Sequence, residues 1–444
     1  MHQTVWLRQA FQGSGPPRST PSRAGRVGRD SDGGGRRVVD AAPFRALRYR
    51  PQVAGEPIST SAPAYDEFDP LDYAQHRTAS PYTVLELLAP PTERGYDHAA
   101  ASLERWQRTG VLATDPDPAF FVVEQRRPAT PRRPASVQRG VLAAVRVESP
   151  GPGSAILPHE DVDPVRVAQR LARLRAVPAE LTPVFMIAPT LPEGAHDLFN
   201  RILRREPTVA LADEAGVEHR IVETSADADV ASLRAHLRRL RLVIADGHHR
   251  YAAAVARHER GDPESGRTLA LIVDATSDGL HVLPVHRVLA ELPADWVDRL
   301  APDVAAVPAP AALPALRSAL QREPSGTVAL RVPGAGFLLR PTDLPHLRAA
   351  LSPGRSATWR GLDTALTDHA LLPRLVVDPA KIAYRVDPEA ATEVDRGEAA
   401  ALLLVRPPSV STVLALALRG ERMPAKTTSF RPKPRMGLIM RPLG

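Results

Sequence analysis

Cysteine is absent from this chain of 444 residues, and so are a long apolar run and an N-terminal secretion signal. Without cysteine there is no disulfide, no catalytic thiol and no zinc site built on thiolates. No run of eighteen apolar residues occurs, so we expect neither a membrane span nor a membrane partner. The first residues are too polar for a secretion signal, which makes the cytoplasm the expected location.

The excess of positive charge is confined to the N-terminus. The formal net charge is +7, and residues 1–50, with ten Arg and three Asp, account for all of it. Beyond residue 50, basic and acidic side chains are equal in number. A neutral folded region gives no electrostatic argument for nucleic acid, which we therefore do not expect as a partner. Residues 1–40, rich in Arg, Gly, Ser and Pro, are predicted to be a disordered tail.

Apolar periodicity predicts helices alternating with strands over most of the chain. The predicted helices are 98–109, 164–175, 194–204, 230–240, 251–260 and 362–371. The predicted strands are 119–124, 140–147, 182–187, 218–223, 268–273, 279–283, 381–386 and 399–405. Residues 292–350 are expected to be packing helices around a hairpin at 327–340, and residues 409–418 fit a helix or a strand. We predict an α/β to α+β fold with a mixed sheet and flanking helices.

The strongest candidate site is an apolar run that ends in a polar turn before a helix, at residues 241–251. Its polar and turn residues are Asp246, Gly247, His248, His249, Arg250 and Tyr251. A tight turn between a strand and a helix N-terminus favours anions, because free N–H groups and the helix dipole both point there. Imidazole and guanidinium groups add donors for phosphate oxygens. The alternative is an ordinary Asp-Gly turn with histidines that only cap the helix.

Two further histidine motifs flank this stretch. His159 and Glu160 precede the helix at 164–175 and are candidates for acid–base work or metal binding. The alternative interpretation is that Glu160 and Asp161 only favour the positive end of that helix. His286 and Arg287 form a second His-Arg pair at a predicted strand-to-helix junction, so we expect the two pairs to converge on one pocket.

Lysine is scarce, since the chain contains only Lys381, Lys426 and Lys433. Where arginine carries almost all positive charge, a retained lysine suggests that a compact ammonium is required. The hydroxyl residues after Lys426 are Thr427, Thr428 and Ser429. A P-loop is rejected, because Pro432 and Pro434 forbid the helix that it must open. The segment is interpreted as an extended ligand clamp or, alternatively, as a basic surface strand.

Eight motifs together resemble the domain-of-unknown-function family 1015. In this chain they are residues 43–45, 63–66, 106–112, 157–160, 183–185, 245–251, 283–287 and 423–438. The resemblance implies one globular region over residues 41–444, in which a phosphate-site core at about 136–290 is completed by 376–444. The chain departs from the family pattern at Ala64, where proline is usual, and at Val162, where threonine is usual. The second departure removes a hydroxyl near Glu160.

The Asp-Gly-His-His-Arg motif is similar to the phosphate-contacting motif of the ParB/sulfiredoxin-like superfamily. Members of that superfamily bind nucleotides, and some phosphorylate free serine. The similarity implies a ParB/sulfiredoxin-like core with additions, ATP or ADP with Mg²⁺ as cofactors, and a nucleotide-dependent phosphotransferase that acts on a small, serine-like hydroxyl metabolite. Two alternatives remain open: a phosphoserine-type phosphatase and a non-catalytic nucleotide-sensing module.

This hypothesis assigns roles to individual residues. The catalytic candidates are Asp246, His248, Glu160 and Lys426. The candidates for substrate and phosphate binding are Gly247, His249, Arg250, Tyr251, His286, Arg287, Thr427, Thr428, Ser429, Lys433, Tyr65, Asp66 and His159. Lys426 would neutralise developing charge, because phosphoryl transfer depends mostly on positioning and electrostatics. Asp246 or Glu160 would orient the attacking hydroxyl, with Asp246 also a possible metal ligand. Tyr65 and Asp66 would close the pocket.

Overall fold

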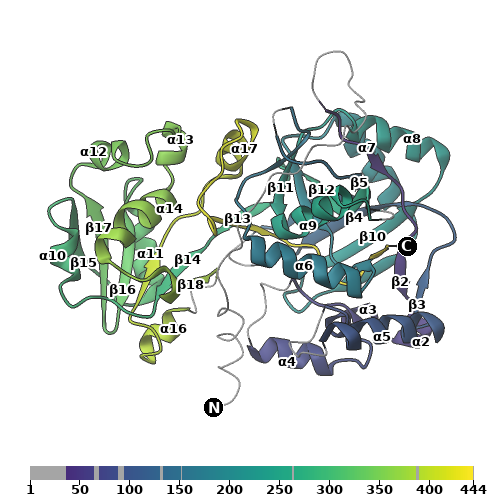
Figure 1. The fold of residues 1–444 in the computed structure, drawn as a ribbon, viewed down its shortest axis with the longest axis horizontal. Coiled ribbons are helices and arrows are strands. Elements are labelled where there is room, and N and C mark those ends of the chain that lie inside the picture. The colour runs from purple at the N-terminus through teal and green to yellow at the C-terminus, as the bar shows by residue number, and fades with distance from the viewer. Residues whose placement is uncertain are drawn as a thin grey trace.

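The computed structural model describes residues 37–64, 70–88, 95–130, 134–151, 153–262, 265–386 and 390–443. Most of the predicted disordered tail, and both Tyr65 and Asp66, lie outside these ranges. The described residues form two lobes, each built on its own sheet (Figure 1). In the described part of the chain, no helix is both long enough and apolar enough to cross a membrane.

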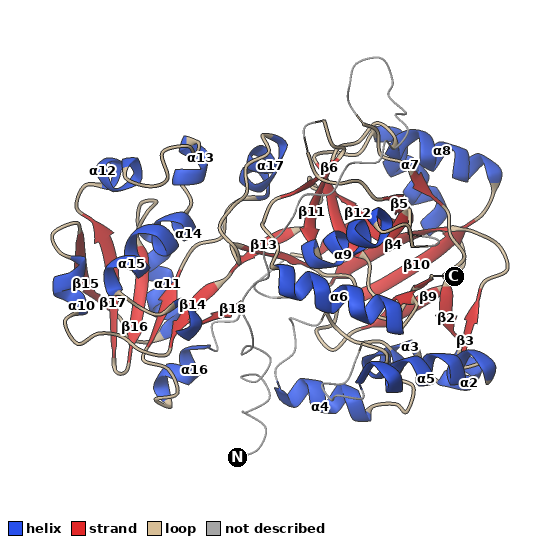
Figure 2. Ribbon diagram, viewed as in Figure 1, coloured by secondary structure: helices blue, strands red, loops and turns tan. Residues whose placement is uncertain are grey.

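The larger lobe is built on a nine-stranded mixed sheet (Figure 2). Its strands are β1 (Ala41–Ala42), β4 (Phe120–Arg127), β5 (Ser136–Arg146), β6 (Ile156–Pro158), β8 (Val184–Ala188), β9 (Val209–Ala212), β10 (Glu218–Thr224), β11 (Leu242–Asp246) and β12 (Arg267–Asp274). The order is β6-β11-β8-β12-β5-β4-β10-β9, with β1 beside β5. Strand β6 runs parallel to β11 and β8 parallel to β12, while the other pairs are antiparallel. The predicted mixed sheet is confirmed.

Five longer helices accompany this sheet. They are α5 (Gly95–Arg108), α6 (Pro164–Ala176), α7 (Glu193–Leu203), α8 (Asp227–Leu237) and α9 (His248–Glu259). Helix α6 begins at Pro164, a position where the missing N–H of proline costs nothing. Asp163, just before it, caps the first turn by accepting the Val165 N–H. Both faces of the sheet are covered: Val141 and Ala143 of β5 pack in the core that includes α7, α8 and α9 residues, whereas Leu142 packs in the core on the opposite face. Strands covered on both faces show the near-continuous apolar runs seen here.

The smaller lobe is a six-stranded antiparallel sheet. Its strands are β14 (His286–Leu289), β15 (Val304–Ala309), β16 (Val328–Val332), β17 (Ala335–Pro341), β18 (Ile382–Arg385) and β19 (Ala401–Leu404), in the order β15-β17-β16-β19-β14-β18. Its helical elements are α10 (Trp296–Leu300), α11 (Leu313–Arg322), α12 (Leu344–Ala349), α13 (Ala357–Arg360), α14 (Asp363–Leu366), the π-helical turn η3 (Thr367–Leu371), α15 (Leu372–Leu375) and α16 (Ala390–Asp395). The hairpin predicted at 327–340 is confirmed as β16 and β17. The expectation that 292–350 otherwise forms only packing helices is wrong, because β15 is a strand paired with β17.

The C-terminal segment returns from the smaller lobe to the larger one (yellow in Figure 1). Residues 409–418 become α17 (Val410–Leu418), a helix that Ser409 caps by accepting the Thr412 N–H. Strand β20 (Thr428–Arg431) then pairs antiparallel with β13 (His281–Pro284). Finally, β21 (Arg441–Pro442) pairs with β7 (Ala179–Glu180). The chain therefore crosses between the lobes at β13, before the smaller sheet, and again on its way to β20.

Short elements complete the structure around the N-terminal part of the larger lobe and beside β18. They are β2 (Leu47–Tyr49), β3 (Leu112–Thr114), α2 (Pro51–Ala54), α3 (Pro57–Thr60), α4 (Pro70–Thr78), η2 (Val84–Glu86) and η4 (Pro379–Lys381). Trp106 of α5 packs against Tyr49 and Tyr82 and is 1% exposed, so this group has its own aromatic core.

Candidate functional site

The Asp246-Gly247 turn joins β11 directly to α9, as the sequence predicted. Gly247 caps α9 with φ of 92°, a left-handed conformation that residues with a Cβ avoid. A Cβ at this position would also lie 2.7 Å from the Arg250 guanidinium. The helix begins at His248, three residues earlier than predicted, so the motif forms its first turn. The predicted anion-favouring geometry of strand, tight turn and helix N-terminus is therefore present.

Asp246 lies between two cationic side chains. Its Oδ1 accepts a hydrogen bond from Lys433 Nζ at 2.8 Å, and its Oδ2 accepts one from Arg250. Burial raises the pKa of Asp246, but the charges of Lys433 and Arg250 outweigh that effect and hold the pKa well below its usual value. Because both carboxylate oxygens already accept hydrogen bonds, a metal ion at Asp246 would have to displace one of these cations.

Glu160 lies beside the C-terminal segment. Its Oε1 accepts the Thr427 N–H at 3.1 Å and the Thr428 hydroxyl at 3.4 Å, and its Oε2 accepts the Lys426 N–H at 3.4 Å. Burial raises the pKa of Glu160. The interaction with His159, whose Nε2 lies 3.7 Å from Oε1, and the charge of Lys426 nevertheless lower the pKa to about 2, so Glu160 is ionised at neutral pH. The alternative that Glu160 only favours the start of α6 does not account for these contacts.

His159 and His248 form a buried ring pair. The ring centroids are 4.5 Å apart in an edge-to-face arrangement. His159 Nδ1 donates to the Ile244 carbonyl of β11, and its Nε2 lies 2.8 Å from Thr428 Oγ1. His248 Nε2 accepts the His159 backbone N–H at 3.3 Å. Burial and the neighbouring His159 lower the pKa of His248 to about 3, which keeps its ring neutral.

His249 connects the starts of two helices. Its Nε2 accepts the Asp163 N–H at 3.0 Å, directly before α6. Burial and the charges of Arg166 and Lys426 lower the pKa of His249. A neutral imidazole that accepts at Nε2 carries its proton at Nδ1, so His248 and His249 each offer one Nδ1–H donor. The hydrogen bonds accepted at Nε2 therefore identify Nδ1 as the atom through which each imidazole can donate to a ligand.

Three predicted binding residues direct their side chains away from this cluster. The Tyr251 hydroxyl donates to the Glu148 carbonyl, and its ring is buried in the core. Thr427 is fully buried and its hydroxyl donates to Pro424 O at 2.6 Å. Ser429 follows Thr428 on an extended strand, so their side chains point to opposite faces. These placements favour structural roles for the three residues.

His286 and Arg287 do not open a helix, so the predicted strand-to-helix junction is wrong. Strand β13 ends at Pro284, and both residues begin β14 in the smaller lobe. His286 Nδ1 accepts the Val405 N–H at 3.3 Å, and burial lowers the pKa of this histidine to about 4. Arg287 is fully buried and makes a bidentate ion pair with Asp368. Neither side chain resembles the exposed phosphate ligand that was expected.

Sequence reasoning missed several residues that support the cluster. Arg422 donates to the Glu160 carbonyl at 3.2 Å. Gln125 of β4 donates to the Lys433 carbonyl at 3.0 Å, and Gln138 of β5 donates to Gln125 and to Pro432 O. Both glutamines lie at the polar ends of their strands, beside Arg126 and Arg139, so the sequence carried no signal that they would be buried.

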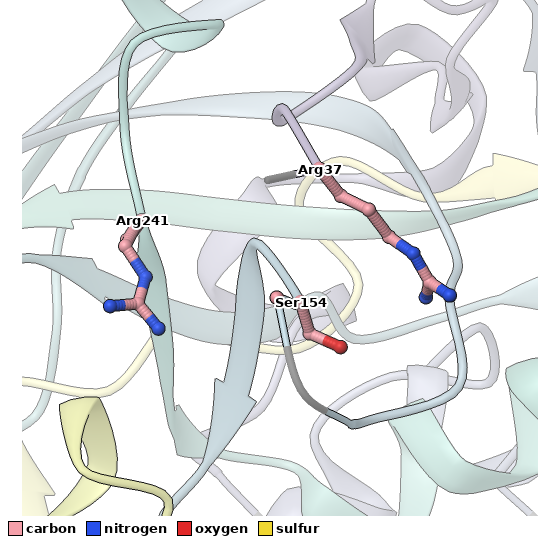
Figure 3. Close-up of a pocket in the computed structure, with 4 residues that line it drawn as sticks. Arg37, Ser154 and Arg241 are labelled. Carbon is pink, nitrogen blue, oxygen red and sulfur yellow. The ribbon is translucent and has the colours of Figure 1, made fainter. Parts of the chain in front are cut away.

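Two surface cavities lie elsewhere in the larger lobe. One, of about 170 Å³, is lined by Arg37, Gly153, Ser154 and Arg241 (Figure 3). Arg241 and Ser154 precede β11 and β6, so this cavity lies at the opposite ends of those strands from Asp246 and Glu160. Figure 3 shows the Arg37 and Arg241 guanidinium groups directed apart rather than toward a shared centre. The other cavity, of about 310 Å³, lies between α7 and α8.

The arrangement joins groups suited to a phosphorylated ligand. The start of α9 offers backbone N–H groups, Lys426 contributes an exposed ammonium, and Glu160 is an ionised carboxylate beside it. Among the described residues, no group of three His, Asp or Glu side chains could hold a metal ion by itself.

Comparison with solved structures finds distant similarity only. A variant of a free serine kinase in complex with ADP is 17% identical, covers 62% of this chain and 84% of its own, and has a TM-score of 0.34. A conserved hypothetical protein from Pyrococcus furiosus (16%; 63% and 88%; TM-score 0.33) and SbnI with C-terminal truncation from Staphylococcus aureus (13%; 68% and 87%; TM-score 0.35) are also similar. No functionally curated protein matches the chain. The family model described as "Protein of unknown function (DUF1015)" matches residues 41–365, and the chain belongs to that family.

Proposed function

We propose that this protein is a nucleotide-dependent phosphotransferase that acts on a small hydroxyl metabolite, with serine as the first candidate. One observation carries the proposal. Three segments far apart in the chain meet so that the N-terminus of α9, the ionised Glu160 and the Lys426 turn are adjacent. A helix start for phosphates, a carboxylate for a hydroxyl and a cation for developing charge are the components that phosphoryl transfer requires.

The phosphate groups of the nucleotide bind at the start of α9 in this proposal. Backbone N–H groups there and the Nδ1–H groups of His248 and His249 donate to phosphate oxygens. Neutral imidazoles suit this role, because they provide directional donors without the cost of burying further charge. Lys426 supplies the mobile positive charge. Lys433, which is held by Asp246, keeps the turn and the C-terminal segment together instead of contacting the ligand.

Glu160 orients the attacking hydroxyl. A carboxylate with a pKa of about 2 is a weak proton acceptor, so its contribution is to hold the hydroxyl in line rather than to store its proton. Mg²⁺, bound mainly through the nucleotide phosphates, would neutralise charge on the transferred group. Glu160 is then the better carboxylate for the metal, since both oxygens of Asp246 already bind cations.

Phosphorus NMR tests the proposal most directly. The protein is incubated with Mg²⁺ and ATP or ADP, with and without L-serine, and separately with phosphoserine alone. A phosphoester signal that requires both nucleotide and serine would establish the kinase and its acceptor. Release of phosphate from phosphoserine alone would instead establish the phosphatase. Line broadening of the nucleotide without turnover would indicate a sensing module, and no change in any sample would reject the phosphate site.

A further inference from the structure

We infer that Arg287 and Asp368 of the smaller lobe are positioning residues that hold the Lys426 turn against Glu160. The inference rests on the proposed function for its catalytic consequence, but not for its structural content. It gives a role to the buried Arg287, which sequence reasoning had assigned to the ligand, and to its partner Asp368. It also gives the smaller lobe a positioning role in a site that lies on the larger lobe.

Lys426 adopts a backbone conformation that requires external support. Its φ is 59°, in the left-handed region that residues with a Cβ rarely adopt. Its side chain is exposed, so packing of the side chain does not fix the turn. The support comes from the two peptide groups. The Lys426 N–H donates to Glu160, and the Lys426 carbonyl accepts a hydrogen bond from Arg287 at 3.2 Å.

Arg287 is organised to make that contact. The side chain is fully buried, its Nη1 donates to Val285 O and Lys426 O, and its guanidinium lies 5.3 Å from the centre of the Tyr384 ring. Asp368 accepts from Nε at 2.8 Å and from Nη2 at 2.6 Å, so four of the five N–H donors are used. These hydrogen bonds fix the orientation of the guanidinium, and Nη1 is thereby directed at Lys426 O.

Asp368 lies in the π-helical turn η3 of the smaller lobe, between α14 and α15. Such turns are uncommon and occur often at functional positions. Thr364, one turn earlier on α14, lies with its hydroxyl 3.2 Å from the hydroxyl of Thr427. The consecutive elements α14 and η3 therefore support both residues of the turn. Asp368 of η3 acts on Lys426 through Arg287, and Thr364 of α14 contacts Thr427 directly. The smaller lobe sets the turn from one side and Glu160 sets it from the other.

This geometry assigns a mechanical role to the smaller lobe. Any movement of its sheet relative to the larger sheet moves Arg287, and with it the peptide that carries Lys426. Displacing a catalytic group by about 1 Å can cost on the order of 100-fold in rate. We therefore expect the Arg287 contact to affect kcat through Lys426 while leaving nucleotide binding at α9 nearly intact.

The three lysines provide a test that needs no substrate. Protein labelled with ¹⁵N-lysine has three lysine amide signals, for Lys381, Lys426 and Lys433, assigned with single Lys→Arg variants. In the double variant Arg287→Met/Asp368→Asn, the Lys426 amide should shift and its heteronuclear NOE should fall. The Lys433 amide should keep both values. Removing both charges avoids a stranded buried ion, which keeps the variant folded.

A matched pair in the same sheet serves as the control. Arg331→Met/Asp395→Asn removes another Arg–Asp pair of the smaller lobe, joined at 2.5 Å between β16 and α16. This variant should leave the Lys426 amide unchanged. If the first double variant does not fold, Arg287→Lys, which keeps a cation beside Asp368 but lacks the planar guanidinium, should still reduce the Lys426 NOE. An unchanged Lys426 signal in the folded Arg287 or Asp368 variants would overturn the inference.

Kinetics then separate the inference from the proposed function. In a working phosphotransferase, Arg287→Met/Asp368→Asn should lower kcat by about 10- to 100-fold with little change in the KM for nucleotide. If the wild-type protein transfers no phosphate, the proposed function fails while the NMR result still decides the role of Arg287. If kcat and the Lys426 signal are both unaffected in the double variant, the positioning role fails by itself.

Discussion

Asp246 and Lys433 are separated by 187 positions in the chain, yet their side chains meet at 2.8 Å. Lys433 is 2% exposed in its side chain, so its ammonium is removed from water and paired with this carboxylate. The contact fastens the C-terminal segment to the turn that opens α9. The integrity of the candidate site is thereby linked to the stability of the fold, and the following predictions separate the two.

Replacing Lys433 by methionine should destabilise the protein. The change removes a buried cation from Asp246 and frees the C-terminal segment, and removing one partner of a buried pair costs about 3 to 5 kcal/mol. Urea unfolding followed by circular dichroism would measure the loss. Lys381→Met is the control, because Lys381 pairs with Glu291 at the surface and should change the midpoint little. Equal midpoints for the two variants would contradict the assigned role of Lys433.

Replacing Lys426 by methionine should lower phosphotransfer without destabilising the protein. Its ammonium is exposed, so the melting temperature should stay within about a degree or two of wild type. Phosphotransfer should fall by about 100-fold or more, since the developing charge loses its cation. Differential scanning fluorimetry and the phosphorus NMR assay give the two values. A large fall in melting temperature would instead indicate that Lys426 supports the fold.

His248 should make stability depend on pH. Its pKa is about 3 when folded, against an ordinary value near 6.5, so between these values the unfolded chain binds a proton that the folded chain does not. The free energy of unfolding therefore falls as pH decreases through this window, by up to about 1.4 kcal/mol per pH unit for this group. Glu160, whose pKa is also lowered, adds a loss of the same sign below pH 4.5.

Substitution of His248 by glutamine should flatten this dependence. Urea titrations at pH 4.5, 5.5 and 6.5 would show a smaller slope in His248→Gln than in wild type. The matched control is His258→Gln, which removes an exposed histidine from the last turn of the same helix. The interpretation is wrong if the slope persists in the His248 variant, or if the His258 variant removes it equally.

Gly247→Ala should disturb both the turn and the anion site. The new Cβ meets a positive φ of 92° and lies 2.7 Å from the Arg250 guanidinium, so Arg250 must move away from Asp246. Gly261→Ala is the control for backbone strain alone, since Gly261 has φ of 75° and open space around it. Both variants should lose about 1 kcal/mol through strain. A fall in affinity for ADP or inorganic tripolyphosphate, measured by calorimetry, is expected only for Gly247→Ala.

Local pattern was sufficient for most of the larger lobe. Periodicity placed α6, α7, α9 and the strands around them within a few residues, because amphipathic spacing and capping residues such as Asp163 act locally. The turn at Gly247 was predictable for the same reason. In the smaller lobe, β15 has the sequence VAAVPA, whose alanines and proline carry no clear strand period, and this strand was missed although the hairpin and the strands β18 and β19 were predicted.

Which residues make up the site depends on tertiary contacts, and local sequence pattern does not predict such contacts. Nothing around Arg287 shows that Asp368, 81 residues later, takes up its guanidinium. The resemblance of Leu-Pro-Val-His-Arg to the first His-Arg pair was therefore interpreted as a second ligand motif. Similarly, Ser429 was grouped with Thr428 by chemistry, although the alternation of a strand sends neighbouring side chains to opposite faces.

The path of the C-terminal segment also sets the order in which the site can be assembled. Every strand that β20 and β21 contact is synthesised before them, and Glu160, Asp246 and Arg287 all precede Lys426. A nascent chain that stops short of residue 426 already contains every strand of both sheets, yet it lacks Lys426 and Lys433. Assembly of the candidate site therefore waits for the segment from residue 426 onward, which must pair with strands that have already been made.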